Sequence, residues 1–164
     1  MVSHRVVMFG FPGAQILDVT GPLEVFARTA RWLREHRGIR PDAYTVELVA
    51  ETKGPILMSS GLGVIASRRY TVVRGMDTLL IAGGIGYRSL LGNRAVLDWI
   101  SRSASRVERV GSICTGAMLL AAAGLLDGRR ATTHWNHFTH LSALAPRARI
   151  DRDAIYVRGG NNFT

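Results

Sequence analysis

The chain has 164 residues, of which 47% are hydrophobic, and its 21 Lys and Arg against 12 Asp and Glu give a formal charge of +9. A chain of this length can bury one hydrophobic core without disulfides or a structural metal, and its composition excludes disordered, collagen-like and coiled-coil classes. Cys114 is the single cysteine. It excludes an intramolecular disulfide and a multi-thiolate metal site, and it favours a reduced, cytoplasmic setting.

The positive charge is dispersed and does not predict a nucleic-acid site. Lys53 is the only lysine, and the arginines run through nearly the whole chain. In the densest run the arginines are spaced by three, so they wind around a helix and form no single stripe. This pattern indicates a solvated face. The longest apolar run, residues 117–126, is too short to span a bilayer, which takes about 20 residues, so no membrane segment is expected.

The first half of the chain alternates strand and helix patterns. The predicted elements are a strand at 6–11, a helix opening at Gly21 and Pro22, a strand at 44–50, a strand pair or irregular excursion within 54–67, and a strand at 78–82. Pro is tolerated in the first helical turn because its missing N–H would have no partner there. The continuous apolar run at 78–82 is typical of a central parallel strand that is covered on both faces.

The second half continues the alternation. Its predicted elements are a helix at 96–104, a strand at 109–113, a helix at 115–123, a strand at 130–133, a helix at 136–144 and a last strand at 155–158. Alternating strands and helices predict one α/β domain with a largely parallel sheet. Ligands bind at the carboxyl ends of the strands in such folds. Residues 158–164 have the pattern of a turn that enters a further strand with no covering helix, as in a fragment of a longer product.

The strongest local signal surrounds Cys114, in the segment Gly-Ser-Ile-Cys-Thr-Gly at 111–116. Small residues at a strand-to-helix junction are typical of a nucleophile elbow, which exposes the central side chain. A helix N-terminus favours the thiolate, and its N–H groups can receive an oxyanion. Cys114 is therefore a candidate nucleophile or oxidisable thiol. The alternative is a small buried hydrophobic residue, and the spacing leaves both open.

Three further features could contribute to a site at the same sheet edge. Residues 83–86, Gly-Gly-Ile-Gly, lack dinucleotide-binding spacing and read as an oxyanion-binding turn or an ordinary tight turn. Asp18 gains a role only if the fold brings it to Cys114. His134, His137 and His140 spread over about 120° of a helix without local carboxylates or thiols, so we expect no metal site. His134 is the histidine placed to reach the edge. No cofactor motif is present, and no cofactor is expected.

The motifs resemble those of the DJ-1/PfpI superfamily, which is related to class I glutamine amidotransferases. The resemblance covers nearly the whole chain and rests on blocks at 11–13, 16–18, 21–26, 83–84, 113–117, 122–128 and 131–135. Within the superfamily the pattern is most similar to the N-terminal domain of GlxA-type AraC-family transcription regulators, and isonitrile hydratases are similar in the same blocks. The resemblance implies a flavodoxin-like three-layer α/β sandwich with a mostly parallel sheet and a nucleophile elbow, usually as a homodimer.

The resemblance also implies site residues. Cys114 would occupy the elbow with Asp18 beside it, and Gly84 and Thr115 would supply backbone N–H groups. His134 would lie near the same pocket. Glu24, within the 21–26 block, would belong to the ligand-binding set. Thr115 stands where the protease-like branch has His, which argues against a Cys-His peptidase. The family's domain continues past Thr164 with a long helix, so we expect 1–164 to be a domain cut short before its last helix.

These features leave three candidate functions. The first is a domain that binds a small molecule and controls a C-terminal helix-turn-helix domain outside this chain, which alone would contact DNA. The second is an isonitrile-hydratase-like hydro-lyase in which Cys114 attacks the isonitrile carbon and Asp18 shuttles the proton. The third is a redox or carbonyl-stress protein that acts through cysteine oxidation. We favour the sensor because the blocks at 21–26 and 122–135 are most similar to the regulators.

Overall fold

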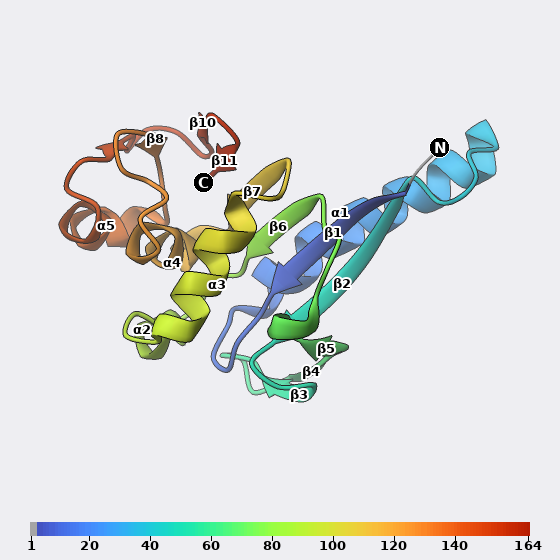
Figure 1. Cartoon of the computed structure of the whole chain (residues 1–164), viewed down its shortest axis with the longest axis horizontal. Coiled ribbons are helices and arrows are strands. Elements are labelled where there is room, and N and C mark those ends of the chain that lie inside the picture. Colours follow the sequence, from blue (N-terminus) through green and yellow to red (C-terminus); the bar gives the residue numbers. More distant parts are fainter. Residues whose placement is uncertain (1–2) are drawn as a thin grey trace.

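A computed structural model describes residues 3–164. Its centre is a seven-stranded sheet in the order β10-β11-β7-β6-β1-β2-β5 (Figure 1), in which every neighbouring pair is parallel except β10 and β11. The strands are β1 (His4–Phe9), β2 (Tyr44–Ala50), β5 (Arg68–Arg69), β6 (Thr78–Ile81), β7 (Arg109–Ser112), β10 (Arg158–Gly159) and β11 (Asn162–Phe163).

Helices cover both faces of the sheet. In Figure 1, α1 (Ile16–Arg37) lies behind the strands and α3 (Arg94–Ala104) lies in front of them. The remaining helices are α2 (Tyr87–Leu90), α4 (Ala117–Ala122) and α5 (Phe138–Leu144), with single 3-10 turns η1 (Tyr70–Val72), η2 (Cys114–Gly116) and η3 (Trp135–His137). The protein is therefore a flavodoxin-like α/β sandwich, as predicted. None of the helices in residues 3–164 is long and apolar enough to cross a membrane.

The central strands bring three chain segments to one edge. In β1, Val6 and Phe9 are completely buried, as expected of a parallel strand covered on both faces. Val6 pairs with Thr78 of β6 and Phe9 with Ile81, so the two strands end together. β7 ends beside them, because Ser112 pairs with Ile81. Consequently the segments that follow β1, β6 and β7 meet at the carboxyl edge.

The first helix begins earlier than the sequence predicts. α1 starts at Ile16, and Pro22 lies inside it instead of in its first turn. The prediction placed Pro22 where its missing N–H costs nothing, but the helix accommodates the lost hydrogen bond within its second turn. Asp18 is consequently a residue of the first helical turn and not of a loop.

The predicted strand pair within 54–67 is an antiparallel hairpin of β3 (Gly54–Leu57) and β4 (Gly63–Ala66). The C-terminal region differs more. β8 (Arg130–Ala131) pairs with β9 (Arg149–Ile150) in a separate two-stranded sheet. The last strand predicted at 155–158 is displaced: β10 begins only at Arg158 and pairs with β11, which in turn pairs with β7. The apolar pair Ile155 and Tyr156 is exposed, so its pattern does not mark a buried strand.

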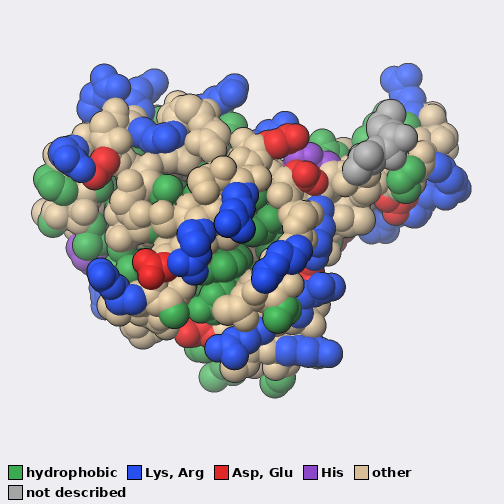
Figure 2. Space-filling view, viewed as in Figure 1, with side chains coloured by type: hydrophobic (Ala, Val, Ile, Leu, Met, Phe, Trp, Pro, Cys, Tyr) green, Lys and Arg blue, Asp and Glu red, His purple; other side chains and the backbone are tan. Residues whose placement is uncertain are grey.

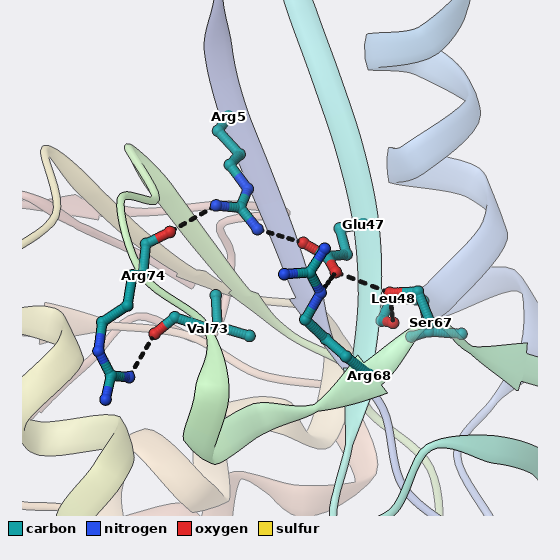
Figure 3. A network of polar contacts seen from close by, with 7 residues as sticks. All are labelled: Arg5, Glu47, Leu48, Ser67, Arg68, Val73 and Arg74. Carbon is teal, nitrogen blue, oxygen red and sulfur yellow. Dashed lines mark hydrogen bonds and ion pairs between the residues drawn. The ribbon is translucent and has the colours of Figure 1, made fainter.

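An ion-pair network joins three strands on the sheet (Figure 3). Arg5 of β1 lies 2.5 Å from Glu47 of β2, and Arg68 of β5 contacts the other carboxylate oxygen. Ser67 donates its hydroxyl to the same carboxylate. Burial alone would raise the pKa of Glu47, but the hydrogen bonds from Arg5 and Ser67 and both arginine charges outweigh it and lower the pKa. The network thus links the edge strand β5 to β2 and β1.

Candidate functional site

Cys114 stands at a strained turn between β7 and α4. Its φ of 53° is in the left-handed region, and among residues 3–164 no other non-glycine residue has a positive φ. Such a conformation persists only where its surroundings impose it. Ile113 donates its N–H to the Ile81 carbonyl at 2.9 Å, and the Thr133 hydroxyl donates to the Cys114 carbonyl at 2.8 Å. Gly116 lies against the carbonyls of Ile81 and Ala82, where no Cβ would fit.

Asp18 reaches the same turn from the first turn of α1. A Cβ added at Gly83 would lie 2.5 Å from Asp18 Oδ2 and 2.6 Å from the Ile113 carbonyl, so glycine allows the three segments to meet. Asp18 Oδ2 is buried and has no hydrogen-bond partner among the described residues. Burial raises the pKa of Asp18, opposed by hydrogen bonds from Gly83 and Cys114 and by His134. The site therefore favours a protonated carboxyl more than water does.

The thiol of Cys114 is also shifted toward its neutral form. Burial raises its pKa first, the charge of Asp18 raises it further, and hydrogen bonds from the Thr115 backbone and hydroxyl oppose the shift. The Thr115 backbone thus favours the thiolate, as a helix N-terminus was expected to do, but burial and the charge of Asp18 outweigh it. α4 is only six residues long and follows the 3-10 turn η2, so its dipole is weak beside the cost of burying a charge.

A pocket of about 370 Å³ opens at this edge. Five of the predicted site residues line it, namely Asp18, Gly84, Cys114, Thr115 and His134. The predicted backbone donor of Gly84 is already engaged, because its N–H donates to Thr115 Oγ1 at 2.8 Å. An anion bound at Gly84 would have to displace this contact. Glu24 does not line the pocket: its exposed carboxylate lies 3.8 Å from Arg31 on the outside of α1.

The three histidines divide between two roles. His134 and His137 line the pocket, with ring centroids 5.8 Å apart, and His140 Nδ1 lies 2.9 Å from Tyr87 Oη. Burial lowers the pKa of His137, and the charges of His134, Arg88 and His140 lower it further. Within residues 3–164, no group of three or more His, Cys, Asp and Glu side chains gathers as a metal ion would require.

Sequence reasoning missed much of the pocket wall. Gln15, Ser59, Tyr87 and Arg88 also line it. Ser59 comes from the β3–β4 hairpin and donates its hydroxyl to Gln15 Oε1 at 2.9 Å, which ties the hairpin to the start of α1. No sequence spacing predicts that these residues lie at the pocket. Arg88 follows the glycine-rich segment at 83–86, and that proximity is the one signal that could have suggested it.

The family assignment follows from comparison with known proteins. Residues 4–164 match the model of the DJ-1/PfpI family. The chain belongs to the DJ-1/PfpI family. Over 143 residues it is 36% identical to an uncharacterised protein of the cpoL 5′ region of Streptomyces lividans, covering 87% of this chain and 96% of that protein.

Two named relatives represent different functions. The isonitrile hydratase of Pseudomonas putida is 36% identical over 154 residues, covering 94% of this chain and 61% of the enzyme. The HTH-type transcriptional regulator CdhR of Pseudomonas aeruginosa is 27% identical over 134 residues, covering 82% of this chain and 40% of the regulator. A crystal structure of a ThiJ/PfpI family protein from Pseudomonas syringae superposes with a TM-score of 0.83 at 25% identity, over all of this chain and 62% of that one. The chain thus spans less than two thirds of both named relatives.

Proposed function

We propose that this domain is the small-molecule sensor of an AraC-type transcription regulator. The observation that carries the proposal is a ligand-sized pocket of about 370 Å³ that is lined by Asp18, Cys114 and His134 from separate segments of the chain. Burial and the charge of Asp18 raise the pKa of Cys114, which disfavours its thiolate. Such a site is better suited to holding a ligand than to attacking one. Relatives of this chain include HTH-type regulators. DNA contact and the cytoplasmic location belong to the proposal, with the DNA-binding domain in a separate segment.

The pocket also offers a route for a signal. Its wall combines Ser59 of the hairpin, Arg88 of α2 and His134 beside η3, which are far apart in the chain. A ligand that contacts all three segments would favour one arrangement of them over others, which is the requirement for a ligand-driven population shift.

We further propose that the domain forms a homodimer through α1 and the adjoining hairpin. Leu17, Val25 and Trp32 are exposed on α1 and lie within roughly 80° of its circumference at 100° per residue. Leu57 and Ile65 of the hairpin are exposed as well. Apolar surface of this kind marks interaction sites. Light scattering should give a dimer for the native protein and a monomer for Val25→Asp.

Isonitrile hydration is a second candidate, favoured by 36% identity over 94% of this chain and by the pairing of Cys114 with Asp18. The thiol would add to the isonitrile carbon: the carbon–sulfur bond forms as Asp18 delivers its proton to that carbon and takes up the proton that the sulfur loses, which gives a thioimidate. Water would then add across the carbon–nitrogen double bond, with its hydroxyl on carbon and its proton on nitrogen. The carbon–sulfur bond would break as the hydroxyl proton passes through Asp18 to the sulfur, and an N-substituted formamide would leave. A neutral carboxyl suits the first proton transfer.

One pair of measurements separates the candidates. Incubation with cyclohexyl isocyanide should give no more N-cyclohexylformamide with the native protein than with Cys114→Ala, whereas cysteine-dependent turnover would establish the enzyme. A thermal-shift screen of several hundred metabolites should yield a ligand whose shift disappears in His134→Ala and persists in Glu24→Gln. The reading frame around these codons should also encode roughly a hundred residues with helix-turn-helix patterns; a frame without them would contradict the regulator.

A further inference from the structure

A second cavity lies on the α3 side of the sheet and shares no residue with the Cys114 pocket. Its volume is about 430 Å³, and it lies between α3 and residues 70–76. One wall is formed by Trp99 and Arg102 of α3 and by Arg106 in the turn that follows this helix. The opposite wall includes Val73 and Arg74.

The cavity is positively charged and has no internal counter-charge. Arg74, Arg102 and Arg106 line it, and none of the lining residues is acidic. Figure 2 shows Lys and Arg side chains around an apolar area at the centre of this face. In the described part of the chain none of these three arginines forms an ion pair, whereas Arg5, Arg34, Arg68, Arg130 and Arg147 do. Arg102 lies in the last turn of α3 and Arg106 lies just beyond its end at Ala104, so both bring positive charge to the same cavity, and a bound anion would offset it.

Arg74 is held in place before any ligand arrives. Its Nη1 donates to the Val73 carbonyl at 2.8 Å and to the Thr71 carbonyl at 3.0 Å, which leaves its other guanidinium nitrogens free. Arg5 donates to the Arg74 carbonyl, which connects this segment to the Glu47 network. Figure 3 shows the Arg74 side chain extending away from Glu47. The Arg74 side chain therefore loses little conformational entropy on binding.

The inner surface of the cavity is apolar. Trp99 is 8% exposed and Val73 is 3% exposed, and Met76 and Val107 complete the lining on the same side. Phosphate ion alone would occupy only part of such a volume, since cavities of roughly 300–1,000 Å³ hold organic ligands. The shape and charge together therefore suit an anion with an apolar body.

We propose that this cavity binds a small organic phosphate monoester. The guanidinium groups of Arg74, Arg102 and Arg106 hold the phosphate oxygens, since planar guanidinium forks match phosphate geometry and carry a permanent charge. The organic part packs on Trp99 and Val73. The site is independent of Cys114, so it provides a second input to the same domain.

Isothermal titration calorimetry with phenyl phosphate tests the proposal on the full chain. Phenyl phosphate should bind at least about tenfold more tightly than inorganic phosphate, and phenol should not bind; a tenfold ratio corresponds to about 1.4 kcal/mol. The double variant Arg102→Gln/Arg106→Gln should lose at least about tenfold in affinity. Both side chains are exposed, so the variant is expected to fold, and its melting temperature checks this.

Two matched controls and one competitor complete the test. Arg94→Gln removes the same charge from an exposed position of α3 that does not line the cavity, and it should leave the affinity unchanged. Cys114→Ala should also bind normally, which separates this site from the sensor pocket. Absence of binding, equal weakening by Arg94→Gln, or preference for a mixed-sequence DNA duplex over phenyl phosphate would each overturn the proposal.

Discussion

Two carboxylates of this molecule sit in opposite electrostatic environments. Glu47, whose side chain is 10% exposed, is clamped by Arg5 and Arg68, and its pKa is lowered. Asp18 Oδ2 is buried without a hydrogen-bond partner among the described residues, and burial raises the pKa of Asp18. Both side chains are partly buried, and burial raises the pKa of each, so burial alone does not explain why their pKa values move in opposite directions. The partners decide the direction.

This difference in partners indicates that Glu47 has a structural role, whereas Asp18 is available for function. A charge that is matched by two guanidinium groups stabilises the fold wherever it is ionised. An unmatched carboxyl at a pocket costs stability when ionised, and perturbed groups of this kind cluster at functional sites. Removing each carboxylate should therefore change stability in opposite directions.

The largest effect is expected for Glu47→Gln. It leaves Arg5 and Arg68 without a counter-charge, and because both retain partial solvent access the loss should be about 2 kcal/mol in the free energy of unfolding, less than for a fully buried pair. The pKa of Glu47 is lowered in the fold, so its contribution is present above its ordinary value and is lost as the pH falls through the lowered one. Urea denaturation at pH 7 and pH 3 measures both.

Glu24→Gln is the matched control for that experiment. Glu24 is 71% exposed and lies 3.8 Å from Arg31, so its loss should change stability by less than about 0.5 kcal/mol. If Glu47→Gln and Glu24→Gln lost the same stability, the contacts of Glu47 with Arg5 and Arg68 would contribute no more than an exposed surface ion pair.

Asp18→Asn is expected to stabilise the protein by about 1 kcal/mol at pH 8, as substitutions at strained functional sites often do. Since the pKa of Asp18 is raised above 3.8 in the fold, native stability is fullest below that value and declines as the pH rises through the raised one. The advantage of the variant should therefore vanish near pH 3. Denaturation curves across that range check the sign, and a variant that is less stable at pH 8 would contradict it.

The sheet was predictable from the sequence, and the state of the site was not. The strand at 44–50 matches β2 because its apolar pattern is local. The start of α1 was missed because Pro22 resembles a first-turn residue, whereas the helix begins at Ile16. Asp18 and Cys114 were identified by motif, yet the direction of the Cys114 pKa depends on its burial and on the charge of Asp18, which the fold brings together. That tertiary packing has no local signature in the chain.

The effect of Asp18 on the thiol should be smaller but directly measurable. The charge of Asp18 is one cause of the raised pKa of Cys114, so Asp18→Asn should move the midpoint of the alkylation rate against pH downward and speed the reaction with iodoacetamide severalfold at pH 7.5. Cys114 is the only cysteine, so the mass increase reports one site. Glu24→Gln should leave the profile unchanged. If the midpoint did not move in Asp18→Asn, burial and not the charge of Asp18 would account for the raised pKa of Cys114.

The finest test compares the two arginines that hold Glu47. Arg5 is 27% exposed and also donates to the Arg74 carbonyl, whereas Arg68 is 49% exposed. Since an exposed ion pair is worth little, Arg68→Gln should cost about 0.5 kcal/mol and Arg5→Gln about 1 kcal/mol. In the Glu47→Gln background both losses should shrink, which a double-mutant cycle by urea denaturation measures. If each arginine substitution cost the same with and without Glu47, the arginines would stabilise the sheet without acting through Glu47. The different pKa directions of Glu47 and Asp18 would then come from differences in burial and not from the arginine partners.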